Sequence, residues 1–570
     1  SRNASTSATT TDTTSSDSPS TAPETTLTEQ QSAALEQTTD EANKVSGSDS
    51  NAANDPVDPE GVAAGTTDTF SYDPDTDPAA ASSTAPAAAN STAAASADAD
   101  TVIFACPPAP APTNAPADFD NKTNGLIPQG TPVTTTTPTP GTFEADKFIF
   151  SAVDEISDGL GPVYNAQSCR ECHQNPVTGA ISQINELRAG HNLYCNSSNV
   201  CGPDPCPPPQ VCTTKFVDAP GGSLINDRSI PTKNTRTPPF FGAKAQERVP
   251  PLYTAGIIGN GGPITGPEKV RTFRTALNTL GDGFVEAIAD QTLLNIAADQ
   301  VNRTGGQVHG QAIRVPVLES SGCDPTNPAT CAKRVGRFGW KDQHASLLSF
   351  SGDAYLNEMG ITNALFPDEV TNLCNTVSEP NNKPEADGLA DIDHFTRFVR
   401  ATKAPARDAR QAATPAARKG EALFARIGCE ICHAPTLVTA ATGTVVNGGK
   451  YAIPEALGNK SFHPYSDYLL HDVGTGDGIA IAMEEHYGKK MYQIKWKNLS
   501  LENHRSSAYK LRTAPLWGVR THPMLMHDGA SLTFREAILR HRGEASDVTR
   551  HFEQLSQADQ QAIVEFLKSL

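Results

Sequence analysis

The clearest pattern of apolar and polar positions in the chain lies at its C-terminus. Apolar residues repeat there at helical spacing, at Ile563, Phe566, Leu567 and Leu570. The tetrapeptide Ser556-Gln557-Ala558-Asp559, just upstream, has the form of an N-terminal capping box. The pattern predicts a helix that buries one face and closes the chain.

Three further segments carry helix or core signals. Pro415 begins a second predicted helix, with Leu423 and Phe424 near its end, and Thr533 opens a third that runs to about His541. The first core-like stretch is residues 143–150. Strand-like runs are few and short. We therefore expect a mainly α fold with long loops.

The first 105 residues show no such pattern. Ser, Thr, Ala, Asp and Pro dominate them, and seventeen Asp and Glu stand against only Arg2 and Lys44. Such a segment buries too little apolar surface to offset the entropy of ordering. Proline-rich sequence continues to residue 140, so we expect residues 1–140 to be a disordered tail and linker. The remaining chain is only mildly acidic and has no basic stripe, which argues against nucleic acid.

The pentapeptide Cys-x-x-Cys-His occurs twice, at residues 169–173 and 429–433. Two thiols one short turn apart can add to the two vinyl groups of a haem, and the following His can ligate the iron. A zinc site with four thiolates is the alternative, but zinc gives no reason for a His after both pairs. The motifs predict two covalently bound haem c groups, attached at Cys169, Cys172, Cys429 and Cys432, with iron ligands His173 and His433.

Eight cysteines lie outside these motifs: Cys106, Cys195, Cys201, Cys206, Cys212, Cys323, Cys331 and Cys374. An even number of closely spaced cysteines in loops predicts disulfides and an oxidising compartment, with scattered free thiols as the alternative. Cys323 with Cys331 is the first expected pair. Haem c maturation also takes place outside the cytoplasm, so we expect the periplasm or cell surface.

No leader precedes Ser1, which we interpret as removal of a signal peptide, and a lipid anchor upstream of Ser1 stays open. No run of eighteen apolar residues occurs, so no membrane span is expected.

The two halves of the folded region show a faint repeat. Residues 161–164 precede the first motif and residues 236–242 follow it, as residues 420–424 and 512–518 flank the second. This order predicts duplication of one haem-binding domain. We expect an N-terminal haem domain over residues 141–405 and a C-terminal one over residues 406–570.

Five phrases join the haem motifs in one order: residues 159–166, 337–341, 358–362, 470–472 and 527–529. Together they resemble the di-haem cytochrome c peroxidase superfamily, and most of all its di-haem oxidoreductase, or di-haem peroxidase, family. Relatives include the methylamine-dehydrogenase maturation enzyme and rubber oxygenase. The resemblance implies two cytochrome c-like domains, with a reactive N-terminal haem and an electron-transfer C-terminal haem.

The resemblance also implies a second iron ligand for the C-terminal haem. In peroxidases of the superfamily this ligand is a Met on the helix after the His-x-Gly phrase. When residues 527–529 are laid on that phrase, His541 takes the position, and the haem becomes bis-His. Met524 and Met526 are rival ligands, and a surface His at a helix end is the plain alternative.

At the first haem, the resemblance implies that Glu358 of the Glu-Met-Gly phrase moves a proton during O–O cleavage. Trp340 aligns with the tryptophan that lies between the haems of relatives, although a buried core Trp is the ordinary alternative. His191 is a candidate resting-state ligand of the first iron, or else a loop residue. Relatives bind calcium through a Thr-x-Pro phrase, which Thr521 and Pro523 resemble one residue out of register.

The leading hypothesis is a peroxidase that reduces hydrogen peroxide with electrons from a small redox protein. A di-haem oxidase or oxygenase acting on an organic or protein substrate is one alternative. A non-catalytic di-haem electron carrier is the other.

Overall fold

The computed structural model describes only part of the chain. The described residues are 111–132, 139–195, 201–202, 213–218, 223–226, 228–229, 258–259, 262–263, 270–324, 328–367, 378–480 and 507–570. Residues 1–110, the repeat phrase at 236–242 and the cysteines Cys106, Cys206, Cys212 and Cys374 lie outside them. Calls on those residues therefore stay predictions.

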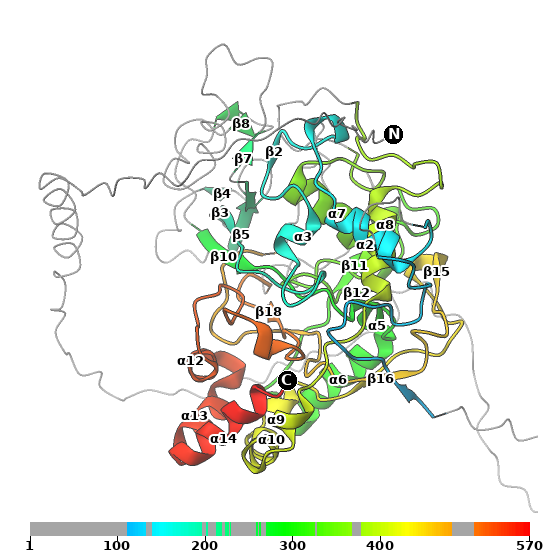
Figure 1. Cartoon of the computed structure of the whole chain (residues 1–570). Coiled ribbons are helices and arrows are strands. Elements are labelled where there is room, and N and C mark those ends of the chain that lie inside the picture. The colour runs from blue at the N-terminus through cyan, green and yellow to red at the C-terminus, as the bar shows by residue number, and fades with distance from the viewer. Residues whose placement is uncertain are drawn as a thin grey trace, which may run out of the picture. The chain divides into compact units, whose positions relative to one another are not determined.

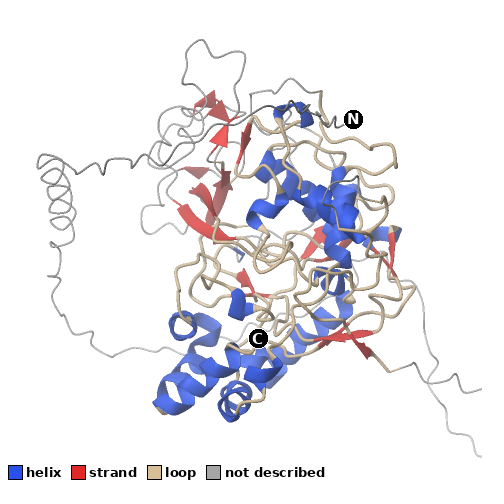
Figure 2. Ribbon diagram, in the orientation of Figure 1, coloured by secondary structure: helices blue, strands red, loops and turns tan. Residues whose placement is uncertain are grey.

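Helices form much of the described core (Figures 1 and 2). The α-helices are α2 (Phe143–Ser151), α3 (Cys169–Cys172), α5 (Asp282–Glu286), α6 (Asp290–Thr304), α7 (Leu347–Met359), α8 (Asp391–Ala401), α9 (Ala409–Ala412), α10 (Pro415–Ile427), α12 (Phe534–Arg540), α13 (Ser546–Gln554) and α14 (Gln557–Leu567). Short 3-10 turns are η1 (Ile156–Asp158), η3 (Pro328–Thr330), η4 (Cys429–Ile431), η5 (Asn447–Gly449), η6 (Val519–Thr521) and η7 (Gly543–Ala545).

The helix starts predicted from capping residues are confirmed. The Ser556 side chain caps α14 by accepting from the Asp559 N–H, and Thr533 with Glu536 forms a capping box on α12. Helix α10 begins at Pro415 behind the N-cap residue Thr414.

Strands are short, as expected, but more numerous than expected. They are β1 (Thr113–Asn114), β2 (Val163–Tyr164), β3 (Asn185–Cys195), β4 (Cys201–Gly202), β5 (Thr213–Asp218), β6 (Leu224–Ile225), β7 (Arg228–Ser229), β8 (Ile258–Gly259), β9 (Gly262–Pro263), β10 (Val270–Thr275), β11 (Arg314–Pro316), β12 (Lys333–Val335), β13 (Leu437–Val438), β14 (Val445–Val446), β15 (Tyr451–Ala452), β16 (Lys460–Phe462), β17 (Leu470–His471) and β18 (Leu511–Arg512). The longest, β3, pairs antiparallel with β10, β4, β5 and β6. The expectation of few strands is therefore wrong, because the loop after the first haem motif folds into this sheet.

Two apolar clusters place the haem motifs. The larger one packs α2 against α8 through Phe143, Phe150 and Phe398 and extends to Trp517. The second packs α10 against α13 and α14 through Phe424, Phe552 and Phe566. Each cluster thus holds one helix that lies upstream of a Cys-x-x-Cys-His motif.

The repeat is looser than the sequence phrases indicated. Residues 163–164 form strand β2, whereas residues 420–424 lie within helix α10. The helix that corresponds to α10 in the first half is instead α2, which ends at Ser151, well before Cys169. The matched lead-in phrases are therefore not equivalent segments, because only the second one continues a helix into its motif.

Ordered structure begins upstream of residue 141. Strand β1 pairs with β16, and the buried side chain of Asn124 donates to the carbonyl oxygens of Arg400 and Thr402 at 2.8 and 2.9 Å. These bonds order a segment without a large core of its own, because its backbone groups find partners on the folded unit. This corrects the part of the linker expectation that covers residues 111–132.

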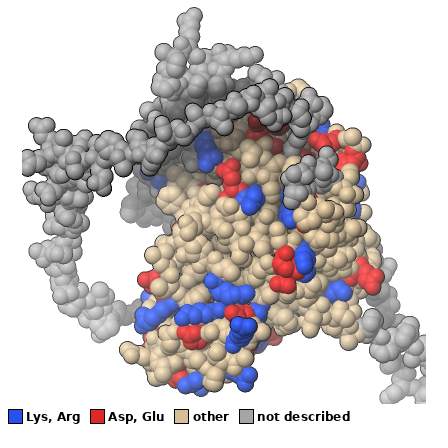
Figure 3. Space-filling model, in the orientation of Figure 1, with Lys and Arg blue, Asp and Glu red and all other residues tan. Residues whose placement is uncertain are grey.

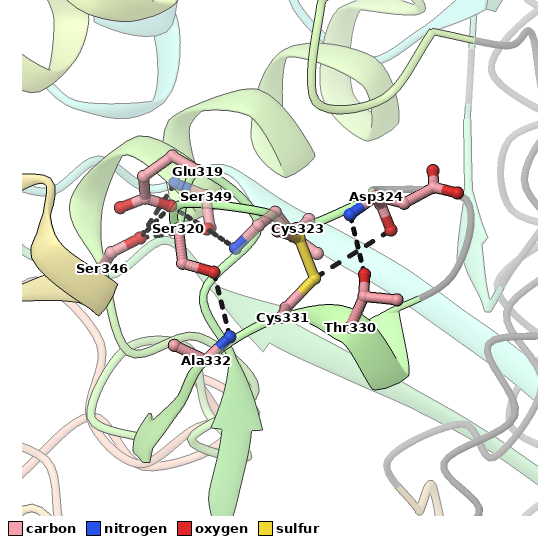
Figure 4. Close-up of a disulfide and its surroundings, with 10 residues drawn as sticks. Glu319, Ser320, Cys323, Asp324, Thr330, Cys331, Ala332, Ser346 and Ser349 are labelled. Atoms are coloured by element: carbon pink, nitrogen blue, oxygen red, sulfur yellow. Dashed lines mark hydrogen bonds between the residues drawn. A yellow bond between two sulfur atoms is a disulfide. The ribbon is translucent and has the colours of Figure 1, made fainter.

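Cys323 and Cys331 form a disulfide, as predicted from their short spacing (Figure 4). The loop between them is tied further by the Asp324 N–H, which donates to Thr330 Oγ1 at 2.8 Å. Cys195 and Cys201 are direct register partners across β3 and β4. Among the described helices, none combines the length and apolar character needed to cross a membrane.

Candidate haem sites

The first motif folds as a single helical turn. Helix α3 contains both cysteines, and the His173 N–H that ends it donates to the Cys169 carbonyl oxygen at 3.1 Å. The Phe150 ring lies 6.3 Å from the His173 ring. Burial, followed by the nearby charge of Glu358, raises the pKa of the Cys172 thiol to about 12. Both thiols of this motif are thus held neutral, because burial also raises the pKa of Cys169.

The second motif repeats this construction. Gly428 ends α10 with a φ of 102°, which lets the chain turn directly into η4 and the two cysteines. The His433 N–H donates to the Cys429 carbonyl oxygen at 3.0 Å, and the Phe424 ring lies 6.1 Å from the His433 ring. Each motif therefore places its His beside a phenylalanine from the helix that precedes it.

The two cysteine pairs do not come together. Among the described residues, the only cluster of three or more potential ligand atoms within 4.8 Å of one another is Cys432, Asp467 and His471. A zinc site with four thiolates needs all four sulfur atoms around one ion. The zinc alternative therefore has no support in the fold.

Three histidines have the tautomer that an iron ligand needs. The Nδ1 atoms of His173, His433 and His541 lie 3.2, 3.0 and 2.8 Å from the carbonyl oxygens of Ala180, Tyr465 and Ala537, respectively. A carbonyl oxygen only accepts, so each Nδ1 must carry the proton, and each Nε2 keeps a free lone pair. Burial lowers the pKa of all three, and lowers that of His433 to about 4, with the charge of His541 second. All three rings are therefore neutral.

A cavity of about 220 Å³ adjoins the second motif. Its wall includes Cys429, Cys432, His433 and His541, so both predicted iron ligands of this haem face one space. Apolar side chains complete most of the wall, among them Phe424, Val519, Leu525, Phe534, Ile538 and Leu567. Met524 and Met526, the rival ligands, also line it.

The cavity fits a haem by its donor atoms as well as by its walls. Two lining histidines keep a buried ring nitrogen without a hydrogen-bond partner within the described residues, at His522 Nε2 and His527 Nδ1. Buried polar atoms are normally paired. A polar ligand edge, such as a haem carboxylate, would supply the missing partners. Two thiols, two neutral imidazoles and an apolar wall match what haem binding requires.

Comparison with protein families now decides the class. A family model described as "Di-haem oxidoreductase, putative peroxidase" matches residues 268–570, which is more than half of the chain. The chain belongs to this di-haem oxidoreductase family. The resemblance inferred from the sequence phrases is thereby confirmed, and the protein is a di-haem redox protein. The matched region holds the second motif, Trp340 and Glu358, whereas the first motif lies upstream of it.

Two solved structures are similar to parts of this di-haem oxidoreductase. One is hydrazine synthase of Kuenenia stuttgartiensis, at 19% identity and a TM-score of 0.18, covering 32% of this chain and 55% of that one. The other is a MauG-like protein associated with microbial copper homeostasis, at 18% identity and a TM-score of 0.20, covering 32% and 52%. The chain thus spans about half the length of each. A search of curated proteins found no match.

Glu358 lies beside the first haem motif of the family member. It is near the end of α7, and its carbonyl oxygen accepts from the Asn165 N–H at 2.7 Å while Asn165 Nδ2 donates to its Oε2 at 3.0 Å. Burial raises the pKa of its carboxyl well above the usual value, and the charge of Glu186 adds to the rise. Glu358 is therefore a protonated carboxylic acid at neutral pH.

Glu186 is a residue that sequence reasoning missed. It lies on β3, where Arg188 binds it with two hydrogen bonds, of 2.8 and 3.0 Å. The only signal in the sequence was an alternating Glu-x-Arg within a run that had no clear strand pattern. His191 lies five residues along the same strand, so the alternation of side chains puts it on the face opposite Glu186.

Trp340 lines the second cavity and is tied to a segment between the two motifs. Its Nε1 donates to the Thr275 carbonyl oxygen at 2.9 Å. Residues 275–278 line the same cavity, and the next residue, Thr279, donates its N–H to the Gly179 carbonyl oxygen at 2.9 Å. The Gly179 N–H in turn donates to His173 at 2.8 Å. Short bonds thus run from the first iron-ligand candidate to Trp340.

The predicted calcium residues lie next to the second cavity. Thr521 donates its hydroxyl to the Gly518 carbonyl oxygen at 2.7 Å, and Pro523 is exposed. His522, between them, is one of the cavity residues. The calcium site stays a prediction.

The Leu-His-Asp phrase holds an ion cluster beside the second motif. His471 lies between Asp467 Oδ2, at 2.9 Å, and Glu544 Oε2, at 2.8 Å, and its Nδ1 is 3.8 Å from Cys432 Sγ. The sequence marked His471 only as part of a family phrase. Its two acidic partners come from residues 4 and 73 positions away, and the second of these could not be paired with it by local pattern.

Proposed function

We propose that the protein is an extracytoplasmic di-haem c enzyme that reduces hydrogen peroxide. The haems are joined covalently through Cys169, Cys172, Cys429 and Cys432. The Cys323–Cys331 disulfide supports an oxidising compartment. The periplasm or the cell surface is the proposed location.

The observation that carries this proposal is the difference between the two sites. The second site has His433 and His541 on one cavity, which suits a haem with both axial positions filled for electron transfer. The first site has one such His and a protonated acid, Glu358, near its cysteines. A plain electron carrier needs no acid there, whereas O–O cleavage needs a proton donor.

The chain's own residues divide the work. When bound, haem iron supplies the electrons that reduce peroxide. Glu358 holds a proton beside the first motif, and Asn165 fixes the direction of its carboxyl group through Oε2. Trp340 is held by Thr275 at the second cavity and shortens the path for electrons toward the first motif. His541 and His433 hold the second haem in a six-coordinate state.

The proposed electron donor is a small redox protein of acidic surface. The C-terminal helices that wall the second cavity carry exposed basic residues, namely Arg418, Lys419, Arg426, Arg535, Arg542 and Arg550. Figure 3 shows Lys and Arg gathered over this part of the visible face. Positive potential around an electron entry site steers an acidic partner toward it.

Replacing Glu358 with Gln tests the proposal. The change keeps size and polarity but removes the proton, so peroxide turnover should fall by about 10²- to 10⁴-fold while both haems stay attached. Stopped-flow mixing of the reduced protein with peroxide measures it, and Glu319→Gln is the matched control. Glu319 is another buried acid, bound by Ser346 and Ser349 (Figure 4), and its loss should leave turnover unchanged. Unchanged peroxide reduction in Glu358→Gln would refute the assignment.

The electron spin resonance spectrum separates the remaining functions. A high-spin component that reacts with peroxide supports an enzyme, and two inert low-spin haems support the carrier. A di-haem oxidase or oxygenase would show the high-spin component but consume oxygen with an organic or protein substrate rather than turn over peroxide.

A further inference from the structure

The face of β3 next to the first haem motif carries a charged pair. Glu186 and Arg188 are two residues apart, so their side chains lie on the same face of the strand. Arg188 grips both oxygens of Glu186, and its Nη1 also donates to Ser223 Oγ at 3.3 Å. The Glu186 carboxyl is therefore fixed in place from the strand side.

Glu358 meets this pair from the opposite element, α7. A side-chain hydrogen bond joins the carboxyl groups of Glu186 and Glu358. Two carboxyl groups can share a hydrogen bond only if one of them carries a proton, because a carboxylate has no donor. Asn165 holds the far oxygen of Glu358 at 3.0 Å, so this acid too has little freedom to turn away.

We propose that Glu186 and Glu358 form one proton-sharing carboxyl pair, in which Arg188 keeps Glu186 anionic so that Glu358 carries the proton at the first haem site. Glu186 is thus a positioning residue for the reaction proposed above, and the inference rests on that proposed function.

The charges around the pair support this division. Burial raises the pKa of Glu186, but the Arg188 charge outweighs it, so its pKa lies below the usual value, and Arg274 on β10 adds to the lowering. Arg274 is itself paired with Asp477, at 2.7 Å. Burial and the Glu186 charge raise the pKa of Glu358, and Arg188 offsets only part of that rise. Asp353 on α7 and the neutral Cys172 thiol are the other titratable groups that act on the pair or on Arg188.

Such a pair can serve as acid and base in one step. The anionic member accepts the proton that peroxide loses from one oxygen, while Glu358 gives its proton to the other oxygen, which leaves as water when the O–O bond breaks. The pair then holds one proton, as before. The remaining oxygen leaves as a second water after two electrons from the donor protein and two protons from solvent are taken up. The sum is one peroxide, two electrons and two protons to two waters.

Infrared spectroscopy of the holoprotein tests the pair without turnover. The parent at neutral pH should show the carbonyl stretch of a protonated carboxylic acid that Glu358→Gln lacks. In Glu186→Gln, Glu358 loses the neighbouring anion and faces an unbalanced Arg188. The midpoint at which this band disappears should then move to lower pH by about one to three units.

The pH profile of peroxide turnover gives the second readout. Activity that needs protonated Glu358 falls as pH rises through its pKa, so Glu186→Gln should move this alkaline limb to lower pH, in step with the infrared midpoint. Glu186→Asp keeps the anion and should restore most of the shift. Glu319→Gln should remove an infrared band of its own without moving the pH profile.

The outcomes separate the inference from the function on which it rests. Turnover that survives Glu358→Gln would overturn both. Lost turnover in Glu358→Gln, with no shift of band or pH limb in Glu186→Gln, would overturn only the pair. If Glu186→Gln fails to fold, Arg188→Gln replaces it. That variant frees Glu186 to take up a proton, so a second acid band should appear at higher pH than in the parent, and its absence would refute the pair.

Discussion

Single side chains at the second site make its predicted ligation testable. His541 ends helix α12, where its Nδ1 donates back to Ala537 one turn earlier. That bond turns what the sequence left as a surface helix-end histidine into an oriented ring on the cavity. The two rival methionines lie on the same cavity wall, so position alone does not choose between them.

Replacing His541 with Ala should convert the second haem from low-spin to high-spin, because it opens one axial position. Met524→Leu and Met526→Leu are matched controls that line the same cavity and should leave the low-spin spectrum intact. Absorption and electron spin resonance spectra of the purified variants measure the change. A low-spin spectrum retained in His541→Ala but lost in either Leu variant would transfer the ligand role to that methionine.

Trp340 is the second residue whose role has a kinetic signature. Replacing it with Phe removes the indole and its hydrogen bond to Thr275 but keeps an aromatic ring in the buried site. We expect slower electron transfer between the haems, with both spectra unchanged. Flash or stopped-flow reduction of the second haem, followed at the first, measures the rate. Trp517→Phe is the control, because this other tryptophan belongs to the larger apolar cluster. An unchanged rate in Trp340→Phe would leave Trp340 a packing residue.

Elements meet most closely where α10 crosses α14, the two helices that enclose the second motif. Gly420 lies at this crossing, and a Cβ atom there would overlap the backbone carbonyl oxygen of Ala562. The apolar residues Leu423 and Phe424 then pack against Ile563 and Phe566. The contact sets the position of the haem motif, because α10 runs directly into it.

Gly420→Ala should therefore destabilise the protein, although Ala is the better helix former by about 1 kcal/mol. Backbone cannot move aside as a side chain does, so we expect a loss of about 1–3 kcal/mol in the free energy of unfolding. Ala422→Gly, exposed on the same helix, is the control and should cost only about 1 kcal/mol. Urea unfolding of both variants decides the matter, and a stabilised Gly420→Ala would contradict the crossing.

At the scale of the whole molecule, a buried charge cluster joins segments that are distant in sequence. Asp477 receives Arg274 at 2.7 Å and Lys341 at 2.8 Å, and all three side chains are almost fully buried. Burial alone would raise the pKa of Asp477, but the two cations hold it below its usual value. The cluster thus links strand β10, the Trp340 phrase and the C-terminal half.

Asp477→Asn should lower the free energy of unfolding by about 3–5 kcal/mol at neutral pH, because two buried cations lose their counter-charge. The folded pKa of Asp477 lies below its unfolded value of about 3.9, so its contribution is present above that pH and is lost as pH falls toward the folded pKa. The variant should lack this acid-dependent loss. Asp299→Asn, in an exposed pair with Arg303, should change stability by less than about 1 kcal/mol. Thermal unfolding from pH 3 to pH 7 measures both.

The sequence by itself determined the local features of this protein. Both haem motifs, the capped helices α10, α12 and α14, and the disulfide between Cys323 and Cys331 depend on residues close together in the chain, so their patterns are legible without a fold. Motif order was also enough to identify the di-haem family, which the family model confirmed.

Only the tertiary structure decided which distant residues share a site. Glu186 and Glu358 stand 172 positions apart and meet because a sheet in the loop after the first motif packs beside α7. His471 likewise gains Glu544 from 73 positions away. Carboxyl and imidazole groups acquire their function from burial and from the charges next to them, and neither is written in local sequence. Those contacts form only when the chain closes on itself.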